Sequence, residues 1–113
     1  MPDTGAATIV ARCDALSDPT RWAVLELVGE RARSATEIAQ LRTESRQAIS
    51  RHLAVLAEVG LVETERRGRA VLHRAVGGQL SALGHDLDTI GRAWEARLGR
   101  LALMAEEAEG GRE

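Results

Sequence analysis

The sequence predicts a mostly helical domain that carries one small β-hairpin. Two short amphipathic segments, at 34–41 and 45–59, are separated by only three residues, which favours two helices joined by a tight turn. The segment at 61–76 has strand-like stretches on either side of an Arg-Gly pair, which is typical of a hairpin. Apolar residues then recur at spacings of three and four over 80–104, which predicts a long C-terminal helix.

Capping residues predict where the early helices begin. Ser34 and Glu37 have the spacing of a capping box, so a helix is expected to start there. Asp18 and Pro19 predict the start of an earlier helix, in which Trp22 is interpreted as a core residue. A helix nearer the N-terminus places four apolar residues on one face: Ile9, Val10, Cys13 and Leu16.

The segment at 45–59 is predicted to be a helix with one apolar and one polar face. Ser45 is suited to cap it by accepting a hydrogen bond from the amide of residue 47 or 48. Gly60 is suited to end it in a left-handed conformation. Three residues form the apolar stripe, which is expected to face the core: Ile49, Leu53 and Leu56.

The polar face of this helix carries side chains that suit the base edges and phosphates of DNA. In the major groove arginine pairs with guanine and glutamine with adenine. On an isolated helix such residues would indicate only a solvated surface, but the neighbouring segments make a helix-turn-helix followed by a hairpin. The residues expected to contact DNA from this helix are Ser45, Arg46, Gln47, Ser50, Arg51 and His52.

The hairpin at 61–76 is interpreted as a wing beside that helix. Its predicted turn is Arg67-Gly68. Arg66, Arg67 and Arg69 cluster at its tip, where they would reach phosphates or a narrow minor groove. An Arg-rich turn alone indicates only soluble surface, whereas its place directly after a helix-turn-helix favours a DNA contact.

Together these segments resemble the ArsR/SmtB family of small winged-helix transcriptional repressors. Three stretches carry the resemblance, which extends over 11–104: ALSDPTRWAVLELV (15–28), SRQAISRHLAVLAEVGLV (45–62) and RRGRAVLHR (66–74). The resemblance implies a winged helix-turn-helix that binds double-stranded DNA as a sequence-specific repressor and a homodimer, on an inverted-repeat operator. The turn departs from the pattern, because Thr43 and Glu44 stand where a glycine and an apolar residue are common.

The long C-terminal helix is expected to form the dimer. A domain of 113 residues cannot bury so long an apolar stripe against itself, so the same helix of a second subunit is the expected partner, packed with the first helix. The predicted interface consists of Ile9, Cys13, Leu83, Leu87, Ile90, Trp94, Leu98 and Leu101. The domain is expected to span residues 1–105 and the acidic tail at 106–113 to be disordered.

The formal net charge of −2 argues at first sight against a nucleic-acid partner. The distribution of charge answers this objection, because residues 42–74 hold seven arginines against four glutamates while both flanks are acidic. A basic middle between acidic flanks focuses positive potential on the predicted reading surface.

Many members of the family sense metal ions, but this sequence offers few side chains that could bind one. A lone cysteine cannot form a thiolate site by itself, and Cys13 lies on an apolar stripe, which favours a buried side chain. His85 and Asp88 are weak candidates for an intersubunit site, since a divalent ion normally has three or four ligands. His52 is interpreted as a packing or phosphate contact, and His73 is expected to face solvent or phosphate. No cofactor is expected, and the alternative functions are a metal-responsive repressor and a winged-helix module for protein interaction.

Other classes of function are disfavoured. No Ser-His-Asp, Cys-His, paired-carboxylate or phosphate-loop pattern is evident, so an enzyme is not expected. A winged-helix module for protein interaction should carry apolar anchors on the outer face of 45–59, which instead carries Gln, Ser and Arg. No signal peptide and no apolar run of about 20 residues is visible, so we expect a cytoplasmic protein without a membrane partner. The operator, the regulated genes and any small-molecule or metal effector are left open.

Overall fold

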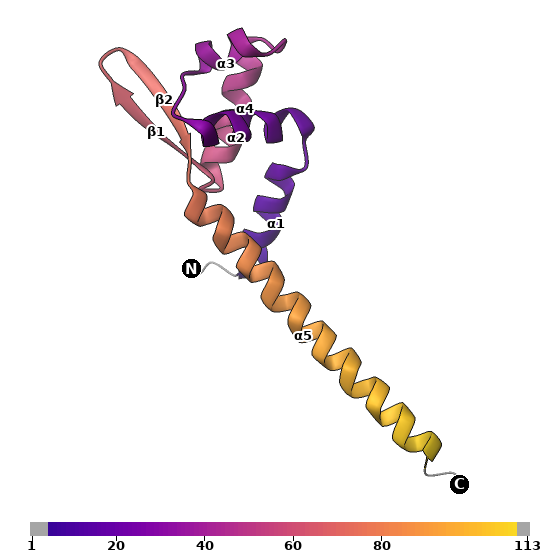
Figure 1. Ribbon diagram of the computed structural model, residues 1–113. Coiled ribbons are helices and arrows are strands. Elements are labelled where there is room, and N and C mark those ends of the chain that lie inside the picture. Colours follow the sequence, from indigo (N-terminus) through magenta and orange to yellow (C-terminus); the bar gives the residue numbers. More distant parts are fainter. Residues whose placement is uncertain (1–4, 111–113) are drawn as a thin grey trace. The chain divides into compact units, whose positions relative to one another are not determined.

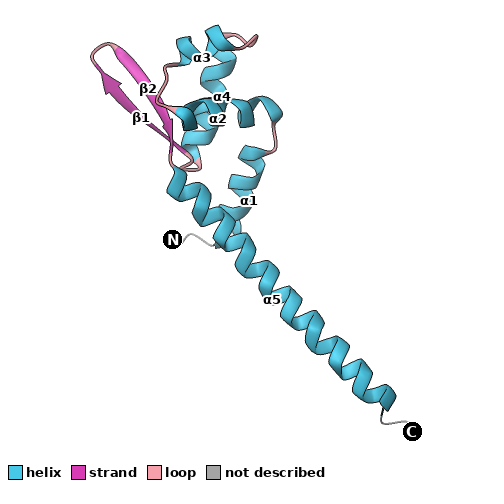
Figure 2. Ribbon diagram, in the orientation of Figure 1, coloured by secondary structure: helices cyan, strands magenta, loops and turns pink. Residues whose placement is uncertain are grey.

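The computed structural model describes residues 5–110, and its elements follow one another in the predicted order (Figure 1). They are α1 (Gly5–Leu16), α2 (Pro19–Glu30), α3 (Ala35–Leu41), α4 (Arg46–Glu58), β1 (Val62–Arg67), β2 (Ala70–Ala75) and α5 (Gly77–Gly110). The chain divides between Leu83 and Gly84 into two compact units. Four helices, an antiparallel hairpin and a last helix confirm the mostly helical winged helix-turn-helix (Figure 2).

The core of the first unit lies between the facing sides of α2, α3 and α4. Within it Ile38, Ile49 and Leu56 have no exposed surface. Complete burial of an aliphatic side chain stabilises a fold by about 1.5–3 kcal/mol. The core residues are Ala15, Val24, Leu25, Val28, Ile38, Ile49, Leu53, Leu56, Leu61 and Val62. The predicted apolar stripe of α4 is confirmed, and the opposite side of α4 faces solvent.

Both ends of α4 are fixed by the residues that the sequence singled out. Ser45 Oγ accepts a hydrogen bond from the Ala48 amide at 3.1 Å. At the other end Gly60 has φ +81°, and the Leu61 amide donates to the Leu56 carbonyl at 3.0 Å in a Schellman arrangement. Glycine adopts this left-handed conformation more readily than other residues do. Gly60 therefore sets the direction in which the chain leaves α4 for the hairpin.

Caps also fix the starts of α2 and α3. Asp18 Oδ1 accepts from the Arg21 amide at 3.0 Å. The Arg21 guanidinium reaches back to the Ala15 carbonyl at 3.2 Å, which ties the end of α1 to α2. Ser34 and Glu37 form the predicted capping box, with reciprocal hydrogen bonds of 3.1 and 3.2 Å. The helix starts predicted from these residues are therefore confirmed.

The hairpin closes through a two-residue loop of Gly68 and Arg69, with Arg67 opposite Ala70 as the last pair of the ladder. The loop thus lies one residue later than the predicted Arg67-Gly68. Gly68 has φ +63°, whereas no residue other than glycine has a positive φ among residues 5–110, which makes the turn type II′. The twist of this turn type matches that of the two strands. A loop at Gly68 and Arg69 therefore allows β1 and β2 to pair regularly up to the turn.

Two residues interpreted as buried are exposed. Trp22 is 42% exposed. The side of α2 that faces the core carries Val24, Leu25 and Val28, and Trp22 does not lie on that side. Cys13 is exposed, because the position of α1 that enters the core is Ala15. A core tryptophan and a buried thiol were therefore wrong expectations for the single chain.

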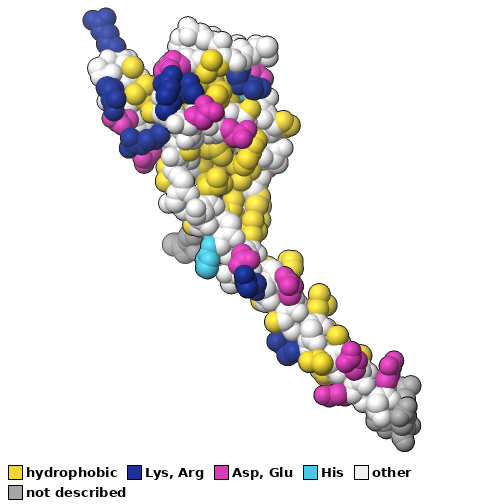
Figure 3. Space-filling model, viewed as in Figure 1, with side chains coloured by type: hydrophobic (Ala, Val, Ile, Leu, Met, Phe, Trp, Pro, Cys, Tyr) yellow, Lys and Arg dark blue, Asp and Glu magenta, His cyan; other side chains and the backbone are white. Residues whose placement is uncertain are grey.

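The second unit is the part of α5 that begins at Gly84. The helix continues to Gly110, so it runs past the predicted domain boundary at 105, and residues 106–110 of the expected disordered tail are helical. Residues 111–113 lie outside the described residues. Figure 3 shows hydrophobic side chains along this helix. Among the described residues, no helix is both long and apolar enough to cross a membrane.

Candidate nucleic-acid interface

The outer face of α4 is the side turned away from the buried Ile49 and Leu53. Five of the six DNA contacts expected on this helix are exposed: Ser45, Arg46, Gln47, Ser50 and Arg51. Gln47 and Arg51 lie on the outer face, whereas Arg46 lies on the side of Leu53 and is exposed because it begins the helix. His52 is half-buried. Gln47 and Arg51 are four positions apart, so they lie one turn apart on the same face. The predicted reading surface is therefore available to a partner along its length.

The arginines of this surface differ from those in the rest of the first unit in whether they form hydrogen bonds within the chain. Residues 5–83 contain eleven arginines. Seven donate hydrogen bonds within the chain: Arg12, Arg21, Arg31, Arg33, Arg42, Arg67 and Arg74. The other four donate none to any described residue, and all belong to α4 or the hairpin: Arg46, Arg51, Arg66 and Arg69. Their guanidinium groups remain available to acceptors outside the chain.

The outer face of the hairpin, made by residues 63, 65, 67 and 74, is balanced in charge. Arg74 donates to Glu63 at 2.7 Å and to Glu65 at 2.9 Å. Arg67 donates to Glu65 at 3.1 Å. The hydrogen bond from Arg67 is the main cause that lowers the pKa of Glu65. This face therefore has little net charge to offer to a phosphate.

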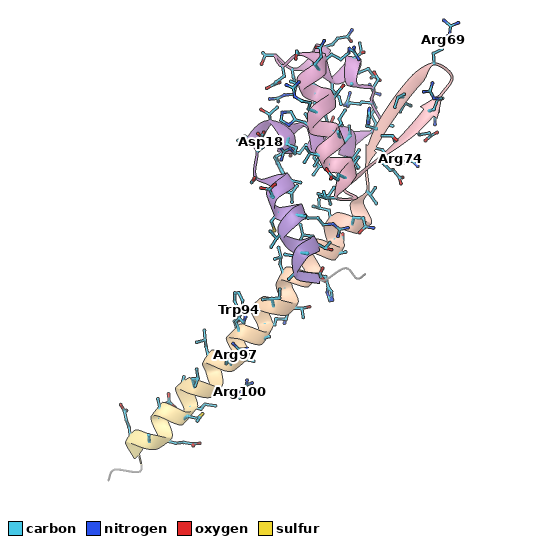
Figure 4. The ribbon with its side chains drawn as sticks, turned by 180° about the vertical axis from the view of Figure 1, so that it is seen from behind. Asp18, Arg69, Arg74, Trp94, Arg97 and Arg100 are labelled. Atoms are coloured by element: carbon cyan, nitrogen blue, oxygen red, sulfur yellow. The ribbon has the colours of Figure 1, made fainter. Side chains whose placement is uncertain are left out.

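The inner face of the hairpin carries Arg66 opposite Val71. The arginine cluster predicted at the tip is thus divided, because Arg66 and Arg67 point to opposite faces and Arg67 is already paired. Arg69 projects from the loop itself (Figure 4). The unpaired charge of the wing comes from Arg66 and Arg69. Strand alternation in the sequence already separates Arg66 from Arg67, whereas the pairing of Arg67 with Glu65 is not evident from the sequence.

The turn between α3 and α4 is held by an ion pair that the sequence analysis missed. Arg42 Nε donates to Glu44 Oε1 at 2.8 Å and its Nη2 donates to Oε2 at 3.2 Å. Thr20 of α2 donates to the same carboxylate at 3.4 Å. The hydrogen bonds from Arg42 are the main cause that lowers the pKa of Glu44 to about 2. The acidic residue that departs from the family pattern therefore fastens the turn to α2.

A groove of about 480 Å³, the wing groove, lies between the start of α3, the first turns of α4 and the hairpin. Arg46 and Ser50 line it from α4 and Arg69 from the loop. His73 of β2 also lines it, half-buried rather than facing solvent, and its Nδ1 has no hydrogen-bond partner among the described residues. Burial lowers the pKa of His73. The alternation of β2, which puts His73 on the same face as Val71, is the sequence signal for this position.

Comparisons with known proteins agree with this architecture. Residues 16–65 match the family model described as a helix-turn-helix domain. The structure of an ArsR-like transcriptional regulator from Rhodococcus sp. RHA1 matches with a TM-score of 0.84 and 38% identity, covering 88% of this chain and 94% of that one. The chain belongs to the ArsR family of transcriptional regulators. Family and fold are those of DNA-binding transcription regulators, which are not enzymes.

Two further structures resemble this ArsR-family chain. A possible transcriptional regulator for arsenical resistance matches with a TM-score of 0.62 and 31% identity, over 68% of this chain and 80% of that one. A homodimeric winged helix-turn-helix DNA-binding domain from Mycobacterium bovis shares the fold, with a TM-score of 0.64 and 24% identity, over 80% of this chain and 87% of that one. No curated protein matches the sequence.

The dimer residues expected in this ArsR-family protein differ in exposure. Leu87 is 45% exposed, Leu101 54%, Trp94 59% and Leu98 65%. Cys13 is also exposed, whereas Ile9 and Ile90 are half-buried. Leu83 is 4% exposed, so it is buried by its own chain and does not belong to a free surface. The exposed apolar residues therefore lie mainly on the second unit.

The weak metal candidates of this ArsR-family protein lie on α5. Asp88 accepts a hydrogen bond from Arg92 at 2.7 Å, as part of an ion pair on the helix surface, and His85 is exposed. Among the residues that the structure describes, no group of three or more His, Cys, Asp or Glu side chains is placed to hold a metal ion.

Proposed function

We propose that the protein is a transcriptional repressor that binds an inverted-repeat operator in double-stranded DNA as a homodimer. The observation that carries this proposal is the placement of the four unpaired arginines of the first unit, all on α4 or the hairpin. When guanidinium groups bind the phosphates of DNA, counterions are released from the DNA. This release supplies much of the affinity of a protein for DNA. Within the first unit, the arginines left unpaired are thus gathered where a winged helix meets its duplex.

In this proposal α4 is the recognition helix and lies in the major groove. Gln47 and Arg51 read base edges, because their side chains have the donors and acceptors that match adenine and guanine. Flanking polar groups position the helix on the backbone without reading sequence. The residues assigned to the backbone or the minor groove are Ser45, Arg46, Ser50, His52, Arg66 and Arg69.

The second subunit covers the exposed apolar face of α5 together with part of α1. Trp94, Leu98 and Leu101 are each more than half exposed in the single chain, and burying such a side chain stabilises an assembly by about 1.5–3 kcal/mol. The related domain from Mycobacterium bovis is homodimeric. A two-fold dimer presents two recognition helices to one face of DNA, so half-sites should have centres about 10 base pairs apart or a multiple of this.

Selection of bound duplexes from random DNA, followed by footprinting, tests this function. We expect an inverted repeat that is protected symmetrically. A reporter gene whose promoter overlaps the selected site should fall in expression when the protein is made, and the Arg51→Ala variant is the control that should not repress. Protection of one isolated half-site by a monomer would contradict the dimer, and equal binding to all sequences would contradict the repressor.

A further inference from the structure

The wing groove combines positive charge with hydrogen-bond donors. Its polar lining consists of Ser34, Thr36, Arg46, Ser50, Arg69 and His73. In the described chain no aspartate or glutamate is among the lining residues. Its volume of about 480 Å³ falls within the range of ligand clefts, roughly 300–1,000 Å³. The chemistry of this lining fits an oxyanion.

Arg46 and Arg69 line the wing groove from two different elements, and neither is paired within the described chain. The Arg69 side chain projects beyond the tip of the hairpin (Figure 4). Arg42 shows what a neighbouring carboxylate does to an arginine here, since Glu44 accepts two hydrogen bonds from it. Two like charges beside one groove without a counterion raise the local positive potential. An anion between them is therefore stabilised.

Two further carboxylates near the groove in sequence are already engaged. Glu37 accepts from the Arg31 guanidinium at 3.0 Å and from the Ser34 amide at 3.2 Å. Glu30 accepts from Arg33 at 2.8 Å. Because these acids are held by other partners, the positive charge of the groove is left for an anion from outside the chain.

We propose that the wing groove binds one phosphate of the DNA backbone, on the strand that passes between α4 and the hairpin. The inference rests on the proposed function and assigns a specific phosphate contact within it. Arg46 supplies one charge-assisted hydrogen bond, and Arg69 supplies another when its exposed side chain turns from the tip toward the groove. The hydroxyl groups of Thr36 and Ser50 and the imidazole of His73 supply further donors. Since Arg46 belongs to the recognition helix and Arg69 to the wing, one phosphate held by both fixes the wing relative to α4.

A phosphate group in this groove has two sources, the DNA backbone and a small phosphate-bearing molecule. The placement of the lining favours DNA, because Arg46 and Ser50 line the groove from the exposed first turns of α4, which also carry Gln47 and Arg51. A backbone strand beside bases read by Gln47 and Arg51 reaches the groove without any change in the position of the helix.

Operators that carry one neutral methylphosphonate linkage, moved stepwise along each strand, test the assignment. We expect one linkage in each half-site to weaken wild-type binding about tenfold, as expected for loss of one charge-assisted contact. The same linkage should have no further effect on the Arg46→Ala or Arg69→Ala variant, because the contact is already lost. The matched control is Arg51→Ala, which lies outside the groove and should keep the full tenfold sensitivity.

If every linkage weakened the Arg46→Ala variant as much as it weakens the wild type, the inference would be overturned, although operator binding itself would remain. A second arm follows the His73 imidazole by NMR, assigned through His73→Gln, with operator DNA or inorganic phosphate added at constant ionic strength. We expect operator DNA to shift these signals and inorganic phosphate at the same concentration to leave them unchanged. A shift with inorganic phosphate alone would indicate a small-ligand site and overturn the assignment to DNA. Failure to bind any duplex would overturn the proposed function as well.

Discussion

Arg67 donates a hydrogen bond to Glu65 at 3.1 Å on the outer face of the hairpin. Arg69, in the adjoining loop, donates none to any described residue and projects from the tip (Figure 4). Of these two guanidinium groups one is therefore satisfied within the chain and the other is free, although the two are close in sequence and identical in type.

The two arginines are expected to contribute differently to DNA binding. Arg69→Ala should weaken binding to operator and to random DNA alike and reduce the slope of log affinity against log salt by about one, the value for one phosphate contact. Arg67→Ala, its matched control, should change the slope less, because Arg67 already neutralises Glu65. Titrations from low to physiological salt measure both slopes, and equal slopes for the two variants would contradict this division of the wing.

Base reading is expected to reside in Gln47 and Arg51. Replacing either by Ala should cost about 1–3 kcal/mol on the operator and relax the preference at one base pair in each half-site. The cost on random DNA should be smaller, since base contacts carry specificity and phosphate contacts do not. Competition with operators mutated at single positions measures this, and Glu26→Gln, on the exposed side of α2, is the control. A uniform loss over all sequences would assign these side chains to the backbone instead.

Dimerisation is expected to depend on one face of α5. Leu101→Arg should convert the dimer to a monomer and weaken binding to a two-half-site operator, because the charge enters the same face as Trp94 and Leu98. Leu103→Arg is the matched control, since Leu103 is 61% exposed but lies about 200° around the helix from Leu101. Sedimentation at micromolar protein measures the mass of each variant. A dimer that survives Leu101→Arg would place the interface elsewhere.

The helix ends and the core stripe of α4 were predictable because they depend on local geometry. Ser45 caps through an amide three residues away, and Gly60 supplies a backbone conformation that other residues avoid. The period of the helix alone places Ile49 toward the core. The same local reasoning predicted the order of all seven elements.

The pairing state of each arginine was not predictable, because it depends on strand register and on contacts between elements. Because the loop lies one residue later than predicted, Arg67 is the last residue of β1, where its side chain pairs with Glu65 two positions before it. Glu44 was seen only as a departure in the turn, and its partner Thr20 comes from a different helix. Exposure of Trp22 likewise depends on how α2 is rotated against its neighbours. A sequence pattern does not define that rotation.

The ion pair between Arg42 and Glu44 should make a pH-dependent contribution to stability. In the folded chain the pKa of Glu44 lies at about 2, below its ordinary value of 4.5. The folded state therefore binds a proton less readily than the unfolded state, so the stabilisation is fully present above pH 4.5 and is lost as the pH falls toward 2.

Glu44→Gln should consequently be less stable than the wild type at pH 7, by an amount that shrinks below pH 4.5 as the wild-type carboxylate loses its advantage. Asp18, Glu37 and Glu65 also have lowered pKa values, but they are common to both proteins and cancel in the difference. Urea midpoints of the two proteins at pH 7, 5, 4 and 3 measure it. A difference that stayed constant down to pH 3 would show that Glu44 acts through its shape and hydrogen bonds, and not through its charge.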